Sequence, residues 1–496
     1  MKHHYYTTLF WALFMSMVTK VASAHDFEVD GIYYKITSTN APLTVAVTFR
    51  GNQVEDYDNE YTGNVTIPET VTYDGNSYSV TKIDNNAFSK CYNLTSITIG
   101  GCTTSIGNGA FYLCTKLNSI NLPNSLISIE ARAFDSCGLP SITIPNGVTS
   151  IGSGAFIDSG LKSITISKSV TSIGYGACSK CLGLTSIVIE KGNPKYDSRK
   201  GCNAIIETAT STLMQGCKST VIPDNVTSIG DGAFKDCRSI TSIVIPDNII
   251  SIGASAFSGC RSLTSITIPN SVTSVGRSAF FGCTGLTSIT ISERITNLSD
   301  NMFDGCSGLT SITIPNGVTT IGERTFQKCT GLTSVAIPDS VTSMGIAAFS
   351  DCKGLTSVTI PYSMKTINLS AFNNCSSLTD VFCFAETVPN TGWSAFYYTV
   401  PLDSATLHVP AISLDTYKST KPWSEFGTII ELTDEEFTGI RSTEYSMPER
   451  ANGSSKNGQG GTEHVYDLNG RQQPKLQQGI NVIQYSDGTT KRILVK

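Results

Sequence analysis

The sequence is poor in charged residues. Asp, Glu, Lys and Arg make up only 15% of its 496 residues, whereas about a quarter is usual for a globular chain. The formal net charge is −5, and it becomes −7 when the segment up to Ala24, which carries Lys2 and Lys20 and no acid, is removed. A nucleic-acid partner requires a basic surface that displaces counterions. The composition therefore predicts no nucleic-acid partner.

Histidine is also scarce. Beyond Ala24 the only histidines are His25, His408 and His464, which stand in different parts of the chain. A His-based triad or a multi-His metal site cannot be assembled from them within one segment. There is no glycine-rich phosphate loop, and the recurring Asp residues stand in turns, where Asp is expected for local hydrogen bonding. We expect no enzyme, no metal and no cofactor.

Long apolar runs are missing except near the start of the chain. Leu9–Val18 is an apolar core that follows Lys2 and precedes the small residues Ala22–Ala24, which is typical of a cleaved signal peptide over residues 1–24. Ten apolar residues are too few for a membrane-spanning helix. We therefore expect an exported protein.

What the sequence does contain is an internal repeat with a period of about 23 residues, and a fixed period of this length is the mark of a repeat architecture. The repeat is recognised by a Phe column and by a Cys column three positions later, and Cys178 fills one place in the Phe column. Twelve repeats can be aligned in this way over residues 80–380. A period of 20–29 residues with an L-x-x-I-x-I core is the signature of leucine-rich repeats.

The spacing within a repeat predicts one coil of a β-solenoid. In Leu263–Pro269 the apolar residues alternate with Ser265 and Thr267, so one face of a short strand points inward and the other outward. Ser271–Gly276 returns along the opposite wall, and Ala279–Phe280 closes the coil. No coil can bury its apolar face alone, so neighbours must stack. The predicted fold is mainly β, a solenoid of about twelve 23-residue coils with inward columns that include Phe257, Phe280, Phe303, Phe326, Cys260, Cys283, Cys306 and Cys329.

This coil resembles the BspA-like (Treponema pallidum-type) leucine-rich repeat family. The stretch "CTGLTSVAIPDSVTSMGIAAFSD" (329–351) carries the resemblance clearly, and it extends over residues 80–380. The resemblance implies a scaffold at the bacterial surface and adhesion to host matrix proteins or to other cells.

Sixteen cysteines in an exported chain would normally indicate disulfides. Eleven of them stand in the inward column, where parallel side chains have poor bridging geometry, so we expect mostly reduced, buried thiols. Cys178–Cys181 has the C-x-x-C spacing of a redox or metal site, but the repeat register explains both positions. The array is interrupted by a β-hairpin insertion (191–220), whose folding would set Cys202 opposite Cys217 as the best disulfide candidate. This insertion could be a variant coil or a recognition element.

The outward strand positions form the candidate contact surface. Rows of hydroxyls recur on it, and tight protein interfaces usually need aromatic or Arg anchors, which are rare here. Binding could be weak and multivalent, or the strongest contacts could lie elsewhere. The candidate residues are Ser265, Thr267, Ser288, Thr290, Ser311, Thr313, Phe382, Trp393 and Trp423.

The two ends of the array differ from the repeat. Residues 25–79 are expected to form an N-terminal β cap and residues 381–432 a C-terminal cap, since a solenoid needs its open coils covered. The aromatic residues Trp393, Phe396, Trp423 and Phe426 suit this cap, and they are also candidates for partner contact. Residues 433–462 are expected to be a flexible linker. The last segment, 463–496, resembles the end of a type IX secretion sorting domain through "VYDLNGR" and "GINVIQ". That resemblance implies contact with outer-membrane secretion machinery, followed by surface attachment or release.

The predicted function is therefore non-enzymatic contact with a protein ligand, a host matrix or cell-surface protein. Two alternatives stay open. One is a structural or glycan-binding surface protein. The other is an enzyme hidden in a cap, which would show as a pocket with a perturbed carboxylate.

Overall fold

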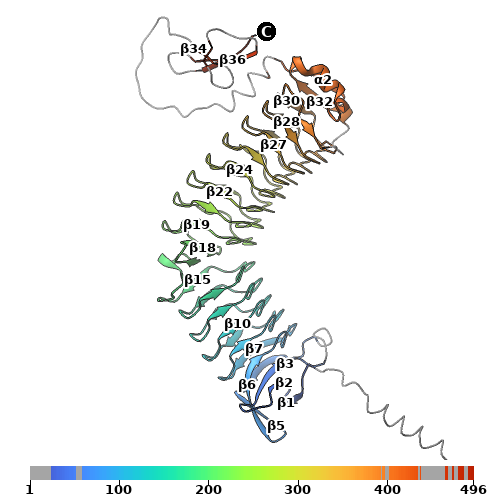
Figure 1. Cartoon of the computed structure of the whole chain (residues 1–496). Helices are drawn as coiled ribbons and strands as arrows, with labels where there is room; N and C mark the ends of the chain where they lie inside the picture. Colours follow the sequence, from blue (N-terminus) through green and yellow to red (C-terminus); the bar gives the residue numbers. More distant parts are fainter. Residues whose placement is uncertain are drawn as a thin grey trace, which may run out of the picture. The chain divides into compact units, whose positions relative to one another are not determined.

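The computed structural model describes residues 24–51, 58–392, 394–396, 402–433 and 436, and the backbone of four strands between residues 464 and 495. The chain divides into two units, Met1–Leu432 and Thr433–Lys496. The first is a β-solenoid (Figure 1). The expected signal peptide and linker lie almost wholly outside the described residues, and stay predictions. Within the described part, no helix is long and apolar enough to cross a membrane.

One wall of the solenoid, which we call the repeat-strand wall, contains the strands with the T-S-I-T pattern, and strands without this pattern extend it at both ends. These strands pair in parallel and in register, so that Ser265, Ile266 and Thr267 face Ser288, Ile289 and Thr290. The wall comprises β4 (Gly63–Ile67), β7 (Leu94–Ile99) and β9 (Ser119–Asn121); β11 (Ser141–Thr143), β13 (Ser163–Ile166) and β15 (Ser186–Ile189); β21 (Ser265–Thr267) and β23 (Ser288–Thr290); and β26 (Ser334–Ala336), β28 (Ser357–Ile360), β30 (Asp380–Cys383), β32 (Thr406–Val409) and β33 (Thr428–Glu431).

The opposite wall, the return wall, consists of two-residue strands after the proline turn. In many coils Pro ends the repeat strand, as Pro361 does after β28, because it cannot donate to a continuing ladder. The return strands are β8 (Ser105–Ile106), β10 (Ser128–Ile129), β12 (Ser150–Ile151) and β14 (Ser172–Ile173); β19 (Ser228–Ile229), β20 (Ser251–Ile252) and β22 (Ser274–Val275); and β24 (Asn297–Leu298), β25 (Thr320–Ile321), β27 (Ser343–Met344), β29 (Thr366–Ile367) and β31 (Asn390–Thr391).

The third side of each coil is the Ala-Phe turn, and it carries a backbone ladder of its own. The N–H of Phe257 donates to the carbonyl of Ala279 in the next coil at 2.8 Å, and the N–H of Phe280 donates to that of Met302 at 2.9 Å. Where both walls are continuous, as between the coils of Ser141 and Ser163, neighbouring coils are therefore hydrogen-bonded on all three sides.

Both expected caps continue this architecture. At the N-terminal end, β1 (Phe27–Val29), β2 (Ile32–Ser38), β3 (Thr44–Thr48), β5 (Thr70–Tyr73) and β6 (Asn76–Ile83) join the return wall, where β6 pairs with β8. At the C-terminal end, β32 and β33 extend the repeat-strand wall in parallel register. Beside them lie α2 (Leu414–Ser419) and the short 3-10 helices Leu402–Ser404, Ala411–Ser413 and Trp423–Glu425.

The solenoid therefore has about 15 turns rather than the twelve expected. Parallel backbone pairing does not require the repeat sequence, so strands without the motif still add turns at the ends. The sequence count missed them because it aligned only the Phe and Cys columns.

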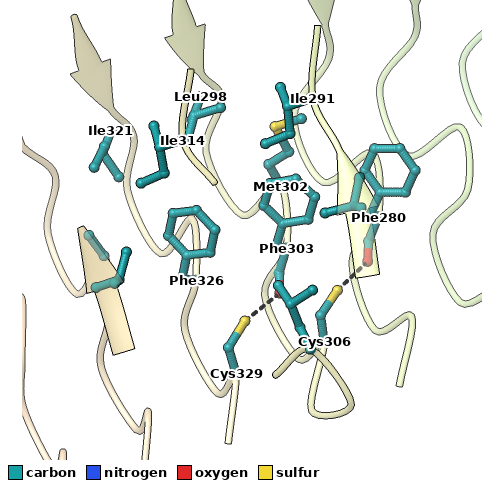
Figure 2. Packing of buried hydrophobic residues seen from close by; sticks show 14 of the residues in the cluster. Phe280, Ile291, Leu298, Met302, Phe303, Cys306, Ile314, Ile321, Phe326 and Cys329 are labelled. Carbon is teal, nitrogen blue, oxygen red and sulfur yellow. Dashed lines mark hydrogen bonds between the residues drawn. The ribbon is translucent and has the colours of Figure 1, made fainter. Parts of the chain in front are cut away.

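The Phe and Cys columns form the core. Phe280, Phe303 and Phe326 are fully buried, and successive rings stack with centroids 5.6 and 5.4 Å apart. Most column thiols donate to the carbonyl of the Phe one coil earlier, as Cys306 does to Phe280 and Cys329 to Phe303, both at 3.2 Å (Figure 2). All sixteen cysteines are free thiols, and burial raises the pKa of Cys283 to about 12.

The core is interrupted at the insertion. Here β17 (Ile205–Glu207) and β18 (Thr212–Gln215) form the expected hairpin, flanked by β16 (Tyr196–Asp197), and β18 pairs in parallel with β19 as a return strand. The following Gly216 takes the place of a column Phe, because its N–H donates to the carbonyl of Ala233 at 2.8 Å. Ring stacking thus ends at Phe156 and resumes at Phe234. The buried apolar residues form two clusters that meet in this region, instead of one continuous core.

The candidate disulfide pair Cys202 and Cys217 is not bridged in the structure, where both residues are free thiols. A register shift between Ile205 and Ile206 adds one residue to the hairpin pairing. Continued along the strands, that shift places Cys217 opposite Asn203 rather than Cys202, because register fixes which residues face each other. The Cys217 thiol indeed donates to the carbonyl of Asn203 at 3.3 Å.

The second unit is an antiparallel sheet with strand order β35-β34-β36-β37. Its strands are β34 (His464–Tyr466), β35 (Gln472–Gln473), β36 (Gly479–Gln484) and β37 (Thr490–Val495). The small C-terminal β segment is thus observed, while its role as a sorting signal stays a prediction.

Candidate functional site

The repeat-strand wall presents the expected hydroxyls to solvent. Ser and Thr of β21 and β23 are exposed on either side of a buried Ile. Ser311 and Thr313 are exposed in the same way, although their coil has no strand at this point. The six hydroxyl residues of the candidate surface, Ser265, Thr267, Ser288, Thr290, Ser311 and Thr313, therefore lie on one wall.

A neighbouring row of threonines has a structural role. The hydroxyl of Thr287 donates to the carbonyl of Thr264 at 3.0 Å, and that of Thr356 donates to the carbonyl of Thr333 at 3.0 Å. These side chains tie one coil to the preceding one.

The outward row that contains Thr267 changes from threonine to valine near the insertion. We call it the Thr267 row; its registered members include Thr143, Thr165 and Val188 before the insertion and Thr267 and Thr290 after it. In the sequence, Val221 and Val244 stand at the corresponding position of the two following coils, one residue before the Ile-Pro that ends the repeat strand. The N–H of Val221 donates to the carbonyl of Cys202 at 3.1 Å, so a residue of the insertion adjoins Val221 here. Three successive coils thus carry valine where threonine is the usual residue. The sequence analysis missed this row because the Gly216 coil was not recognised as a repeat.

These valines are unusually exposed. Val188 is 43% exposed, Val221 72% and Val244 82%, and Leu182 nearby in the chain is 49% exposed. Single exposed apolar residues need no explanation, but apolar residues gathered at one place mark interaction surfaces. We refer to Val188, Val221 and Val244 as the valine patch.

The C-terminal end of the same row is aromatic. Phe382 is half-buried and stacks on His408 of the next strand, with ring centroids 4.3 Å apart. His408 Nε2 lies 3.3 Å from Oδ1 of Asp380. Ile430 follows in register and is 41% exposed. Phe382 is therefore a partly accessible aromatic residue, held in place by its neighbour.

Of the two tryptophans proposed for the contact surface, the structure describes only Trp423. Trp423 is fully buried; its indole N–H donates to the carbonyl of Pro389, and its ring packs edge-on against Phe396 and Tyr417. Its assignment as a contact residue was wrong, because the large ring fills the open end of the core. Trp393 lies outside the described residues.

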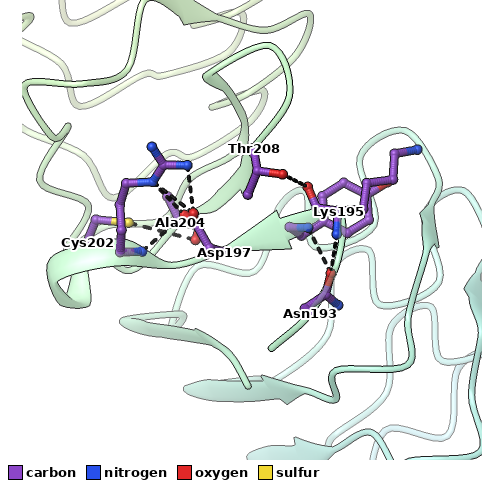
Figure 3. Close-up of polar contacts among 8 residues, drawn as sticks. Asn193, Lys195, Asp197, Cys202, Ala204 and Thr208 are labelled. Atoms are coloured by element: carbon purple, nitrogen blue, oxygen red, sulfur yellow. Dashed lines mark hydrogen bonds and ion pairs between the residues drawn. The ribbon is translucent and has the colours of Figure 1, made fainter. Parts of the chain in front are cut away.

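The insertion is held together by polar contacts of its own. The side-chain oxygen of Asn193 accepts the N–H groups of Lys195 and Tyr196, and Asp197 pairs with Arg199 at 2.6 Å (Figure 3). The hydroxyl of Thr208 donates to the carbonyl of Lys195 at 3.0 Å. The insertion is thus an ordered element built into the return wall.

The N-terminal end contains a cleft of about 590 Å³, within the range of small ligand sites. It lies between the turn that joins β1 to β2, strand β4 and strand β5. Its lining carries the carboxylates of Asp30 and Glu60, the rings of Tyr34 and Tyr61, and the side chains of Thr62, Asn64, Thr66, Thr70 and Thr72. The β1–β2 turn is Asp30-Gly31 with both φ angles positive (50° and 75°), as a tight hairpin turn requires.

Burial perturbs the titrating groups of this cleft. It raises the pKa of Glu60 to about 7, although the backbone N–H of Arg50 donates to the carboxylate at 2.7 Å. Burial, with a smaller contribution from Asp30, raises the pKa of Tyr34 to about 12. The cleft therefore contains a carboxylate with a perturbed pKa, which is the feature expected of an enzyme site hidden in a cap. Among the described residues that line it, however, Asp30 is the only other carboxylate and there is no His, Cys, Lys or Arg.

The C-x-x-C pair has no metal-site geometry. Cys181 donates to the carbonyl of Phe156 at 3.0 Å, as the other column thiols do, and burial raises the pKa of Cys181 to about 11. No group of three or more potential metal ligands occurs among the residues that the structure describes.

Parallel stacked coils, with in-register T-S-I-T strands on one wall and a Phe and a Cys column inside, define a leucine-rich repeat protein. The "BspA type Leucine rich repeat region" matches residues 81–200, 213–318 and 296–421 in six copies, and the chain belongs to this family.

Solved structures of bacterial leucine-rich repeat proteins are similar to this chain. One from Eubacterium ventriosum is 24% identical, covers 76% of this chain and 95% of its own, and has a TM-score of 0.54, which supports the fold. One from Bacteroides ovatus is 28% identical and covers 74% of this chain and 100% of its own, with a TM-score of 0.48. A leucine rich cell surface protein from Faecalibacterium prausnitzii is 26% identical over 73% of this chain and 94% of its own, with a TM-score of 0.42. No curated protein matches the chain.

Proposed function

We propose that this chain is a non-enzymatic, exported bacterial protein that binds a protein ligand through its repeat-strand wall. The ligand is a host matrix protein or a protein on another cell. The protein is displayed at the cell surface or released, after export through outer-membrane secretion machinery that reads the C-terminal segment. Membership of the BspA-type family supports protein contact as the general role.

The observation that carries this proposal is the valine patch. A wall of hydroxyls alone offers a partner little binding energy, because hydroxyls exchange hydrogen bonds with water at small net gain. Removal of apolar surface from water contributes about 25 cal/mol per Å². Three exposed valines at the corresponding position of the coils around the insertion therefore supply apolar surface that the rest of the wall lacks, with hydroxyls as a polar rim.

The ligand-binding test uses purified protein and immobilised fibronectin, fibrinogen and cell-surface proteins. We expect saturable binding that weakens at least tenfold, about 1.4 kcal/mol, in the triple variant Val188→Thr/Val221→Thr/Val244→Thr. Threonine preserves the branched shape and the strand propensity, so the fold should be unaffected. Absence of saturable binding to any protein would refute the proposal.

A matched control separates the patch from general surface hydrophobicity. Ile127 and Ile250 are 51% and 52% exposed, but they stand beside strands of the return wall. Ile127→Thr/Ile250→Thr should bind like the unchanged protein. If the control weakens binding as much as the valine variant, the contact does not lie on the repeat-strand wall.

Two rival functions have distinct readouts in the same preparation. A glycan-binding protein would bind oligosaccharides on a glycan array and lose this binding when the hydroxyl row is changed. An enzyme would release product from a substrate and lose turnover with Glu60→Gln, because Glu60 is the perturbed carboxylate of the N-terminal cleft.

A further inference from the structure

The N-terminal cleft lies along an open strand edge. Strand β4 pairs with β7, and within the described residues it has no strand on its other side. The neighbouring strand β7, by contrast, is hydrogen-bonded to β4 on one side and to β9 on the other. An edge strand presents unpaired backbone N–H and C=O groups and so offers a template for another extended chain.

The residues that line the cleft show that it follows this edge. Side chains alternate between the two faces of a strand, yet the consecutive residues Asn64, Val65 and Thr66 of β4 all line the cleft. A groove over one face would be lined by alternate residues only. The cleft therefore runs beside the strand, at the place that an additional coil would occupy in the middle of the solenoid. Figure 1 shows β1, β2 and β5 gathered at this end.

The charges of the cleft select the occupant. Both charged side chains among its described lining residues are carboxylates, Glu60 just before β4 and Asp30 in the β1–β2 turn. Buried Tyr34 and Tyr61 supply apolar surface behind them. Tyr61 is held in place, since its hydroxyl donates to the carbonyl of Thr48 at 2.8 Å and accepts the N–H of Tyr33 at 3.1 Å.

We propose that this cleft binds an extended peptide segment of a partner protein, which adds as a strand to the open edge of β4 and places a Lys or Arg side chain against Glu60 and Asp30. Main-chain hydrogen bonds to the edge supply affinity, and the side-chain subsites supply selectivity, as in other cases of strand addition. The length of β4, five residues, sets the length of the bound segment. Pro68 immediately after β4 limits pairing in that direction. This site is separate from the valine patch.

The experiment selects phage-displayed random heptapeptides on the immobilised full chain. We expect enrichment of peptides that combine Lys or Arg with Val, Ile or Thr, and their synthetic forms should bind saturably. Glu60→Gln/Asp30→Asn should weaken this binding at least tenfold. Asn accepts the left-handed conformation of residue 30, and Gln retains an oxygen for the Arg50 N–H, so both changes are compatible with the fold.

Controls separate strand addition from nonspecific attraction of basic peptides to an acidic protein. Asp74→Asn, an exposed acid in the β5–β6 turn outside the cleft lining, should leave binding within twofold. The valine-patch variant should also leave it unchanged, so failure of the proposed function and failure of this site are distinguishable. N-methylation of alternate backbone amides in the peptide should reduce binding at least tenfold, because it removes ladder donors.

Four outcomes would overturn the proposal: no enriched peptides, equal binding to the double variant, equal binding of N-methylated peptides, or an oligosaccharide that competes for or is hydrolysed in this cleft.

Discussion

At the scale of the residue, the Phe and Cys columns fill the core and satisfy buried backbone carbonyls. The stacked rings fill the space between neighbouring coils, and the thiol at the next column satisfies the carbonyl of the preceding Phe, as in Cys283 to Phe257 at 3.1 Å. Cysteine suits this position because it is small, apolar and a weak donor. Burial keeps the thiols protonated by raising their pKa. The solenoid thus uses cysteine for packing rather than for disulfides.

Replacement of one column ring should be costly. Phe280 is fully buried between Phe257 and Phe303, and Phe280→Ser should lower the free energy of unfolding by about 3 kcal/mol or more, as large-to-small core changes do. The neighbouring Phe281 is 44% exposed and provides the control, since Phe281→Ser should cost less than about 1 kcal/mol. Urea denaturation monitored by circular dichroism measures both. An unchanged midpoint for Phe280→Ser would contradict the assignment of this column to the core.

At the scale of the element, the Ala-Phe turn depends on a left-handed residue directly before the Ala. Four coils place glycine there, including Gly154 and Gly232. Others place a residue with a side chain in the same conformation, such as Ser278 with φ 57°. L-residues adopt this region at a cost of roughly 1–2 kcal/mol. The hydrogen bonds between successive Ala-Phe turns offset this conformational cost.

Glycine should relieve that strain. Ser278→Gly should raise the free energy of unfolding by about 0.5–1 kcal/mol, the difference between the relieved strain and the greater entropy of glycine in the unfolded chain. The matched control is Ser274→Gly in β22, where the conformation is extended and glycine should instead cost about 0.5–1 kcal/mol. Thermal denaturation distinguishes the two signs. A loss of stability in both variants would show that the turn is not strained.

At the scale of the whole molecule, the solenoid unit has two apolar clusters joined at the insertion. The break follows from local geometry: a Cβ on Gly216 would lie 2.1 Å from Cε1 of Phe234, so this coil has no room for a column ring. Cys178 leaves the adjacent coil without one as well. In repeat proteins stability depends on nearest-neighbour interfaces, and the interface without stacked rings is expected to be the weakest coupling in the array.

Damage to one cluster should therefore remain local. Phe134 belongs to the N-terminal cluster and Phe280 to the C-terminal one. Hydrogen exchange followed by mass spectrometry should show faster exchange in coils 88–156 for Phe134→Ser and in coils 257–372 for Phe280→Ser, with little change in the other cluster. Equal acceleration on both sides of the insertion would mean that the two clusters unfold as one unit.

Sequence periodicity predicts much of this fold and little of its recognition surface. The strands, the inward columns and the hairpin follow from spacing, because alternation and a fixed period are local properties. The candidate pairing of Cys202 with Cys217 assumed a regular hairpin, and the sequence pattern does not reveal the one-residue register shift between Ile205 and Ile206. Trp423 was assigned to the surface because an aromatic ring near a chain end suits either a cap or a contact, and only packing distinguishes them.

The sequence by itself determined the solenoid, since each repeat can bury its Leu, Ile, Val and Phe only against a copy of itself. It also determined that the repeat strands expose hydroxyls, since their alternation leaves no other face. Only the tertiary structure decided that Gly216 begins a disguised coil, so that the exposed Val188, Val221 and Val244 stand at corresponding positions of the coils around the insertion. The structure likewise decided that β4 ends its sheet beside a cleft containing Glu60 and Asp30. The coil at Gly216 and the edge of β4 both depend on segments that are distant in sequence. Their geometry is set by how coils stack and by where strand pairing ends among the described residues, which no local motif encodes.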